Sequence, residues 1–266
     1  MPAEHAVRIL LLGDIVGKPG RRAVATLLPE LKRKLELHLV IANSENASGG
    51  LGLTPEQAQE LLDVGIDVLT SGNHIWKHKN IRPFLDKEPR LLRPANYPAG
   101  APGHGSGIFE ALDGTPVGVL NLEGQIFMNP LPSPFAEADR HVQRLRQRCK
   151  VVIVDFHAEA TSEKRALGLY LDGRVTAVIG THTHVPTADA QVLDGGTGYL
   201  TDVGMCGPVN SVIGMRKEQV IYRLTTHLPA TFQVAAGPSN VQGALVVADP
   251  GTGKCLEISR HTWQAD

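Results

Sequence analysis

The chain has 266 residues, and its 26 basic and 27 acidic side chains give a formal net charge of -1. This length can bury a core, and no boundary divides residues 1–266, so we expect a single domain. The balanced charge excludes a general attraction to nucleic acid or anionic membranes. Three cysteines without a metal-type spacing favour a reducing compartment. Residues 1–5 lead into a short apolar run, which predicts neither a signal peptide nor a membrane span. We therefore expect a cytoplasmic protein.

Short apolar runs alternate with helical patterns in the first part of the chain. Strands are predicted over residues 7–12, 39–42 and 67–70, and each leads into polar residues. Leucine and valine at helical spacing predict a helix over 20–37. Thr54 to Gln57 form a capping box with proline at the first helical position, which predicts a second helix that ends near Gly65.

The rest of the chain begins with a segment rich in proline and glycine, 83–134, which predicts long loops around one or two strands, including 116–122. Next come a predicted helix over 135–145, a strand at 151–154 that leads to His157, a helix capped by Thr161, and a strand at 175–179. Segments 220–224 and 243–247 are expected to be strands linked by turns. The predicted strands and helices alternate in the first part of the chain, whereas the last part is mostly strands.

The predicted strands end in side chains that can bind metal ions. They lead to Asp14, Glu45, Asn46, Asn73, His74, His157, His182 and His184. Sites assemble at the carboxyl edge of an open α/β sheet, and oxygen and imidazole ligands without thiolates suit iron, manganese or zinc. With Glu45 as a bridging carboxylate, two divalent ions would stay net positive, attract phosphate and activate a shared water. We therefore predict a dinuclear centre that attacks phosphate esters.

Each motif also has a simpler interpretation. Asp14 could cap the helix that follows it, and Glu45 with Asn46 could form a turn. A single histidine such as His157 is more often structural. The pair His182 and His184 is more specific, because alternate residues of an extended segment point to the same side. All motifs together, in this order, favour the metal centre.

Other motifs in the sequence do not predict a nucleotide cofactor or a cysteine nucleophile. Gly13 to Lys18 lacks the spacing of a P-loop, and Gly49 to Gly52 lacks GxGxxG. Cys206 has no convincing base partner in the sequence. We interpret the glycine segments as loop walls and Cys206 as a packed thiol.

The order of these motifs resembles the calcineurin-like metallophosphoesterase superfamily, whose pattern is DxH, GD, GNH[DE], H and GHxH. This chain has Val16 in place of the first-motif histidine, Glu45-Asn46 in place of Gly-Asp, and Ile75 after His74. Together with Asn43-Ser-Glu-Asn46, Arg93-Pro-Ala-Asn96 and Asp202-Val-Gly-Met205, these departures resemble the bacterial YmdB-like branch, described as 2′,3′-cyclic nucleotide phosphodiesterases. The resemblance extends from about Arg8 to Ile258.

The resemblance implies a fold, a metal centre and a catalytic residue. The fold would be a four-layer α-β-β-α sandwich with two mixed β-sheets. Two divalent or mixed-valence transition metal ions, iron or manganese, would share a bridging hydroxide. One ion would be bound by Asp14, Glu45, Asn46 and His184, and the other by Glu45, Asn73, His157 and His182. His74 would not bind metal and would act as general acid toward the leaving alkoxide.

We therefore expect a phosphodiesterase that acts on a small phosphodiester or cyclic nucleotide, with no membrane or duplex nucleic acid as partner. A phosphomonoesterase with the same centre is an alternative, and so is a regulatory protein that binds a nucleotide or an RNA-processing partner and turns over slowly. An amidohydrolase barrel fits less well, because its HxH motif comes from the first strand. The sequence leaves open whether the chain forms a homo-oligomer.

Overall fold

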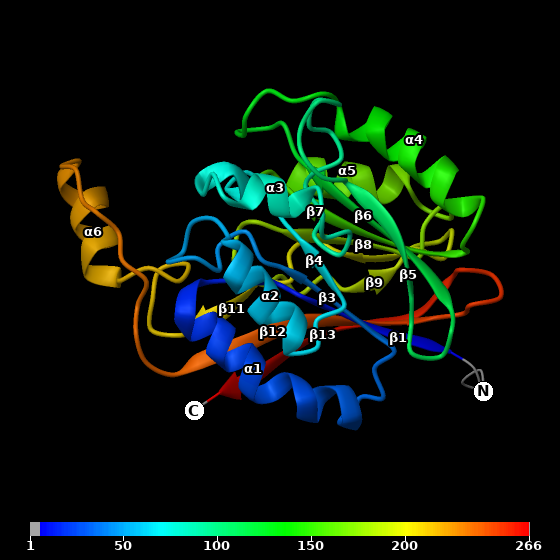
Figure 1. Cartoon of the computed structure of the whole chain (residues 1–266), viewed down its shortest axis with the longest axis horizontal. Helices are drawn as coiled ribbons and strands as arrows, with labels where there is room; N and C mark the ends of the chain where they lie inside the picture. Colours follow the sequence, from blue (N-terminus) through cyan, green and yellow to red (C-terminus); the bar gives the residue numbers. More distant parts are fainter. Residues whose placement is uncertain (1–5, 266) are drawn as a thin grey trace.

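The computed structural model describes residues 6–265, and the segment 1–5, for which no signal peptide is predicted, lies outside the described residues. Two mixed β-sheets pack face to face, and helices cover their outer faces (Figure 1). This arrangement confirms the predicted four-layer sandwich. Within the described range, no helix has both the length and the apolar character needed to cross a membrane.

The first sheet has seven strands. Its spatial order is β2 (Asp14–Ile15), β11 (Met205–Pro208), β12 (Ser239–Ala248), β1 (Val7–Leu12), β3 (Leu39–Asn43) and β4 (Val68–Thr70), and β13 (Cys255–Ala265) also pairs with β12. The neighbours β1, β3 and β4 are parallel, whereas β12 is antiparallel to β1. Both faces of β1 and β3 are covered, which explains why these strands are apolar almost throughout.

The second sheet has six strands. Its spatial order is β5 (Ser106–Glu110), β6 (Pro116–Glu123), β7 (Val151–His157), β8 (Ala177–Thr181), β10 (Gly198–Leu200) and β9 (Gln191–Val192). The inner strands β6, β7, β8 and β10 are parallel, and the two outer strands are antiparallel to their neighbours. Parallel strands place their carboxyl ends at one edge, so β7 and β8 end together.

Three apolar clusters hold the layers together. The central cluster joins the inner faces of the two sheets and includes Leu11, Ile41 and Ile153. The helices α1 (Gly17–Lys34) and α2 (Pro55–Asp63) cover the first sheet, and α4 (Pro134–Arg146) and α5 (Thr161–Tyr170) cover the second (Figure 1). Two short elements, η1 (Ile75–Lys77) and α3 (Ile81–Leu85), follow β4.

Most of the predicted elements are confirmed, including the capping box of Thr54 and Gln57 at the start of α2. Two predictions about individual helices are wrong. Thr161 does not cap α5, because the N-cap residue is Ala160 and no side chain bonds to the free amides there. The segment 220–224 is not a strand but the middle of helix α6 (Lys217–Thr226).

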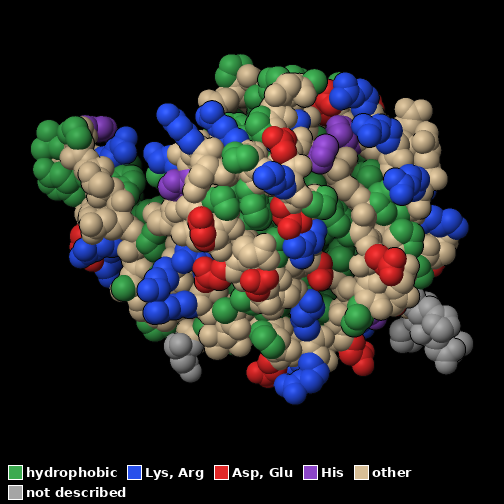
Figure 2. Space-filling view, viewed as in Figure 1, with side chains coloured by type: hydrophobic (Ala, Val, Ile, Leu, Met, Phe, Trp, Pro, Cys, Tyr) green, Lys and Arg blue, Asp and Glu red, His purple; other side chains and the backbone are tan. Residues whose placement is uncertain are grey.

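The helix α6 projects from the body of the molecule, at the far left of Figure 1. Its apolar residues are consecutive, which is typical of a strand, but no sheet edge lies beside them, and the helix satisfies its own backbone groups. Ile221, Tyr222 and Leu224 are exposed. Figure 2 shows hydrophobic side chains at the end of this arm.

Candidate metal centre

The predicted metal ligands all lie where strands of the two sheets end. Asp14 begins β2 directly after β1, Glu45 and Asn46 follow β3, Asn73 follows β4, His157 ends β7, and His182 and His184 follow β8. The first sheet therefore supplies the carboxylates and amides, and the second sheet supplies the histidines. Residues far apart in the sequence become neighbours at this edge.

One group of ligands surrounds Nε2 of His157. This atom lies 3.0 Å from Glu45 Oε1, 3.2 Å from Asn73 Oδ1 and 3.0 Å from His182 Nδ1. Potential ligand atoms of Glu45, His157 and His182 all lie within 4.8 Å of one another. These contacts join the four residues that the family resemblance assigns to one ion.

A second group surrounds Asp14. Its Oδ1 lies 3.5 Å from His184 Nε2 and 3.3 Å from Asn46 Nδ2, and the same amide nitrogen lies 3.2 Å from Glu45 Oε1. Glu45 therefore contacts both groups. The expectation that Asp14 caps the following helix is excluded, because the N-cap residue of α1 is Val16 and no side chain caps the helix.

The buried charges of the centre change the pKa values of its members. Burial raises the pKa of Glu45, but the neighbouring His157 and His74 outweigh this effect and hold it well below the usual value. Burial also raises the pKa of Asp14, but the neighbouring His184 and His157 outweigh this effect and lower it. Burial lowers the pKa of His157, yet Glu45 and Asp14 raise it to about 10. The metal-free centre therefore holds two carboxylates and a cationic imidazole.

Burial and the positive charge of the neighbouring His157 lower the pKa of His182 to about 3. At neutral pH this imidazole is uncharged and has a free lone pair. Its Nδ1 faces His157 Nε2 at 3.0 Å, although one of these nitrogens must then carry a proton. A cation placed between the carboxylates and the imidazoles would use these lone pairs directly, so the donor set fits a metal ion.

The nitrogen of each histidine that faces away from the centre is hydrogen-bonded. Nδ1 of His157 lies 3.0 Å from the hydroxyl of Thr181, and Nδ1 of His184 lies 2.9 Å from the carbonyl oxygen of Ile213. Nε2 of His182 lies 3.1 Å from a carboxylate oxygen of Glu159. Metal-binding histidines in proteins show this arrangement, in which the outer nitrogen donates and the inner nitrogen binds the metal.

The turn that carries His182 and His184 differs from the predicted extended segment. β8 ends at Thr181, and both histidines have positive φ angles, 95° and 64°. The two side chains reach the centre through this turn and not through strand alternation. Non-glycine residues in such conformations are costly and are often found at functional sites.

A buried ion pair supports the same turn. Lys164 Nζ and Asp202 Oδ2 are 2.7 Å apart, and both side chains are 1% exposed. Asp202 Oδ2 also accepts hydrogen bonds from the backbone and the hydroxyl of Thr183, at 3.2 and 2.8 Å. Thr183 lies between the two histidines, so the ion pair fixes the backbone that presents them.

His74 lies beside the centre, as predicted, and is partly exposed. Its Nδ1 is 2.8 Å from Asn46 Oδ1 and 3.1 Å from Glu45 Oε1, and its backbone amide donates to Glu45 Oε2 at 2.8 Å. Nε2 has no hydrogen-bond partner in residues 6–265. This nitrogen is available to a bound molecule.

Glycine at position 72 lets His157 approach the loop after β4. A Cβ atom added to Gly72 would collide with the imidazole ring of His157. The Gly-Asn-His motif therefore requires its glycine for space, in addition to the roles of Asn73 and His74.

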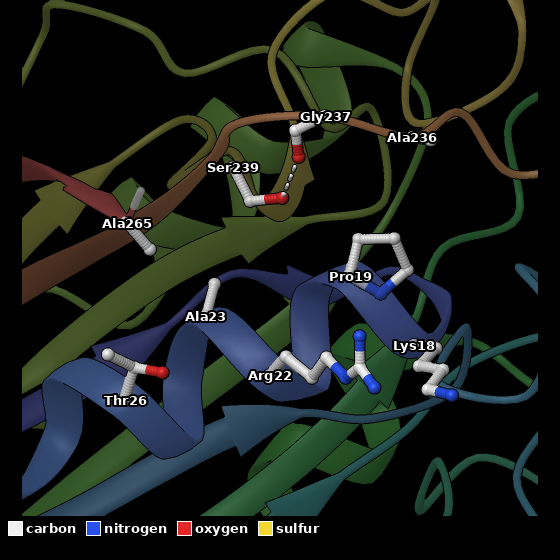
Figure 3. A pocket seen from close by; sticks show the side chains of 9 residues that line it. All are labelled: Lys18, Pro19, Arg22, Ala23, Thr26, Ala236, Gly237, Ser239 and Ala265. Carbon is white, nitrogen blue, oxygen red and sulfur yellow. Dashed lines mark hydrogen bonds between the residues drawn. The ribbon is translucent and has the colours of Figure 1, made fainter.

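The motifs set aside in the sequence do not form a second centre. Cys206 is buried, and burial raises its pKa to about 12, which argues against a nucleophilic thiolate. A cavity of about 300 Å³ between α1 and the segment before β12 contains the cations Lys18 and Arg22 (Figure 3). None of the predicted metal ligands lines it.

Several residues that support the site could not be identified from the sequence. Glu159 follows a predicted ligand by two positions in a loop, and the carbonyl of Ile213 is a backbone group without a sequence signal. Lys164 and Asp202 are 38 positions apart. The only available signal was the motif Asp202-Val-Gly-Met205, which the family resemblance singled out without a role.

Comparison with known proteins finds relatives that match nearly the whole chain. The chain is 47% identical over 254 residues to a 2′,3′-cyclic-nucleotide 2′-phosphodiesterase of Bacillus subtilis, covering 96% of each protein. A crystal structure of a hypothetical protein from Thermus thermophilus is 41% identical, with a TM-score of 0.91 over 98% of this chain and 100% of that one. A phosphatase structure from Mycoplasma pneumoniae is 35% identical, with a TM-score of 0.90 over 98% and 95%.

The family assignment rests on a match over nearly the whole chain. The sequence model of the family described as "YmdB-like protein" matches residues 10–261. This range contains every predicted ligand and His74. The chain therefore belongs to the YmdB-like protein family.

Proposed function

We propose that this chain is a metal-dependent phosphodiesterase that hydrolyses 2′,3′-cyclic nucleotides at a dinuclear metal centre. The observation that carries the proposal is the position of Glu45, a fully buried carboxylate that contacts both ligand groups. The name of the Bacillus subtilis relative, a 2′,3′-cyclic-nucleotide 2′-phosphodiesterase, supports the substrate class.

The ligand groups suit two ions that share Glu45. One would be held by Asp14, Glu45, Asn46 and His184, and the other by Glu45, Asn73, His157 and His182. Oxygen and nitrogen donors without thiolates suit iron, manganese or zinc, and the family resemblance favours iron or manganese. When bound, the two ions would lower the pKa of an attacking water and stabilise the charge that develops on the phosphate oxygens.

Asn46 connects the metal centre to His74. In the structure its amide nitrogen faces Asp14 and its Oδ1 faces His74. A half-turn of this amide would present Oδ1 as a metal ligand and turn the NH₂ group toward Nδ1 of His74. Nδ1 would then accept a hydrogen bond, and the proton of the neutral imidazole would lie on Nε2. Binding of metal and preparation of His74 as a proton donor are thereby coupled.

The proton on Nε2 of His74 suits esters whose leaving group is an alkoxide, and among these the ring strain of a 2′,3′-cyclic phosphate favours the cyclic diester. Hydrolysis of a diester expels an alkoxide, which is a poor leaving group, and a general acid contributes on the order of 10²–10⁴ in rate to such a step. A 2′,3′-cyclic phosphate also releases ring strain when the bond to one ribose oxygen breaks. A monoester dianion would bind as well but gains no strain release.

The test is a comparison of substrates with metal-replete enzyme. The values of kcat/KM are measured for 2′,3′-cyclic nucleotides and for the corresponding nucleoside monophosphates. The cyclic substrates should be hydrolysed faster, and manganese or iron should restore the activity after chelation. A preference of tenfold or more for the monophosphates would overturn the diesterase assignment.

A phosphomonoesterase with the same centre is the second candidate. It is favoured by the name of the Mycoplasma pneumoniae relative, which is called a phosphatase. The same comparison of substrates separates the two, because the ligand set is common to both reactions.

A further inference from the structure

We propose that a cavity next to Asn73 is the binding site for the nucleobase of the substrate, and that Trp76 is its stacking surface. This inference rests on the proposed function and deepens it, since it assigns the part of the nucleotide that lies away from the phosphate.

The cavity adjoins the metal centre. It has a volume of about 430 Å³, and its walls include Asn73, Trp76, Arg82, Tyr97, Glu123 and Leu131. Asn73 belongs to both sites, because its Oδ1 lies 3.2 Å from Nε2 of His157. A molecule that places a phosphate at the metal centre can therefore extend into this cavity.

One short segment of the chain serves both sites. His74 is the N-cap residue of η1, and Trp76 is the middle residue of that turn. The group proposed to protonate the leaving oxygen is thus two positions from the ring proposed to hold the base. This spacing suits a ligand in which a ribose joins the phosphate to an aromatic base.

The aromatic wall offers a surface for a flat ring. The rings of Trp76 and Tyr97 have centroids 5.7 Å apart and planes 32° apart. Tyr97 is buried and fixed, because its hydroxyl donates to Glu123 at 2.7 Å and lies 3.3 Å from the carbonyl oxygen of Gly72. Trp76 is only half-buried and has Tyr97 on one side. Every nucleobase has a π-face, and stacking on an aromatic side chain is a common way to bind it.

The polar groups of the cavity can contact the edge of a base. Glu123 is fully buried, and the oxygen that does not accept from Tyr97 has no hydrogen-bond partner in residues 6–265. An unpartnered buried oxygen is costly unless a ligand or water satisfies it. Every base has at least one N–H group that could be the donor. On the open side, Arg82 is exposed and can donate to base or ribose oxygens.

The experiment uses the two tryptophans of the chain. Trp263 on β13 is also half-buried and stacks on His261, with centroids 5.3 Å apart, so Trp263→Ala is a matched control for Trp76→Ala. Each metal-replete protein is assayed with adenosine 2′,3′-cyclic phosphate and with methyl ribofuranoside 2′,3′-cyclic phosphate, which has no base. The quantity compared is the ratio of the two kcat/KM values.

Trp76→Ala should lower this ratio by on the order of 10- to 100-fold, as expected for the loss of base stacking. Trp76→Phe should recover most of it, and Trp263→Ala should leave it unchanged. An unchanged ratio in Trp76→Ala would overturn the proposal, whether both activities fall together or neither falls.

A binding measurement separates failure of the subsite from failure of the proposed function. In Trp263→Phe protein, Trp76 is the only tryptophan, and its fluorescence is titrated with adenosine 3′-monophosphate or with ribose 3-phosphate. Quenching by the nucleotide alone supports the subsite even if the cyclic diester is not the substrate. Equal responses to both compounds, or no response to either, would overturn the subsite while leaving the diesterase assignment to its own assay.

Discussion

Lys164→Met should destabilise the metal-free protein and loosen the turn that carries two of the histidine ligands. The substitution keeps most of the length of the side chain but removes the charge that faces Asp202 in the interior, where both side chains are 1% exposed. It also removes the hydrogen bond from Lys164 Nζ to the carbonyl oxygen of Thr181, at 2.7 Å.

The expected loss in the free energy of unfolding depends on the hydrogen bonds that Asp202 keeps in the variant. Removing one partner of a buried ion pair costs about 3–5 kcal/mol, because the other charge stays buried. Asp202 keeps hydrogen bonds from the backbone and hydroxyl of Thr183 and from the amide of Gly204 at 2.8 Å, which favours the lower limit. The lost bond to Thr181 adds about 1 kcal/mol. We expect a total loss of about 3–4 kcal/mol in the free energy of unfolding.

The assay is equilibrium urea unfolding in the presence of a chelator, with Lys87→Met as the control. Lys87 is an exposed lysine, so its replacement should change the free energy of unfolding by less than about 0.5 kcal/mol. Metal affinity of the folded variant is measured separately. It should fall by about 10- to 100-fold, as expected when support of a ligand is lost.

A destabilisation of less than about 1 kcal/mol would refute this reasoning, because the hydrogen bonds to Asp202 would then suffice without a buried cation. A variant that is destabilised but keeps full metal affinity would refute the link between the ion pair and the histidine turn. A double-mutant cycle with Asp202→Asn measures the coupling itself, which should lie between about 0.5 and 3 kcal/mol.

Four further predictions concern the centre. Glu45→Gln should deplete both metal ions, whereas Asp14→Asn should weaken mainly one; two ions bound at full affinity in both variants would disprove the bridging role. His74→Ala should keep the fold and the metals but lose about 10²–10⁴ in rate, or about 3–5 kcal/mol of barrier lowering; loss of a metal would instead make His74 a ligand. Glu159→Gln should weaken metal binding by about 10- to 100-fold, measured by competition with a chelator, and an unchanged affinity would remove Glu159 from the support of His182. Finally, the pKa of His157 is raised from 6.5 to about 10, so its charged form stabilises the metal-free protein fully below pH 6.5, and this contribution is lost as the pH rises through about 10. Metal binding must displace that proton, so calorimetry in buffers of different ionisation enthalpy should show proton release at pH 7.5, and its absence would contradict the assigned charge.

The side chains predicted to bind metal could be grouped from the sequence because each follows a strand, and strand ends can be recognised locally. Asp14, Glu45 and His157 each lie next to an apolar run that is long enough to be a buried strand. In open α/β sheets, the carboxyl ends of parallel strands generally lie at one edge, where sites assemble. The local sequence pattern and the general topology of such sheets were therefore sufficient to place the predicted ligands at one edge.

The remaining features depend on contacts that no local pattern contains. β12 pairs with β1, more than 200 residues away in the sequence, and with β11, about 30 residues away. β11 in turn pairs with the strand that begins at Asp14. The positive φ angle of His182 is imposed by its surroundings, because a histidine in isolation disfavours it. The helical state of 220–224 depends on the absence of a neighbouring strand, which is again a tertiary property.

The position of β12 has a consequence for how the protein acquires metal during synthesis. Asp14 is synthesised well before β12, so β1 lacks its antiparallel neighbour until residues 239–248 have been made. His184 in turn is oriented by the carbonyl oxygen of Ile213. A nascent chain therefore lacks the strand and the carbonyl group that position Asp14 and His184 until residues 239–248 have been synthesised, so metal loading should follow the synthesis of β12.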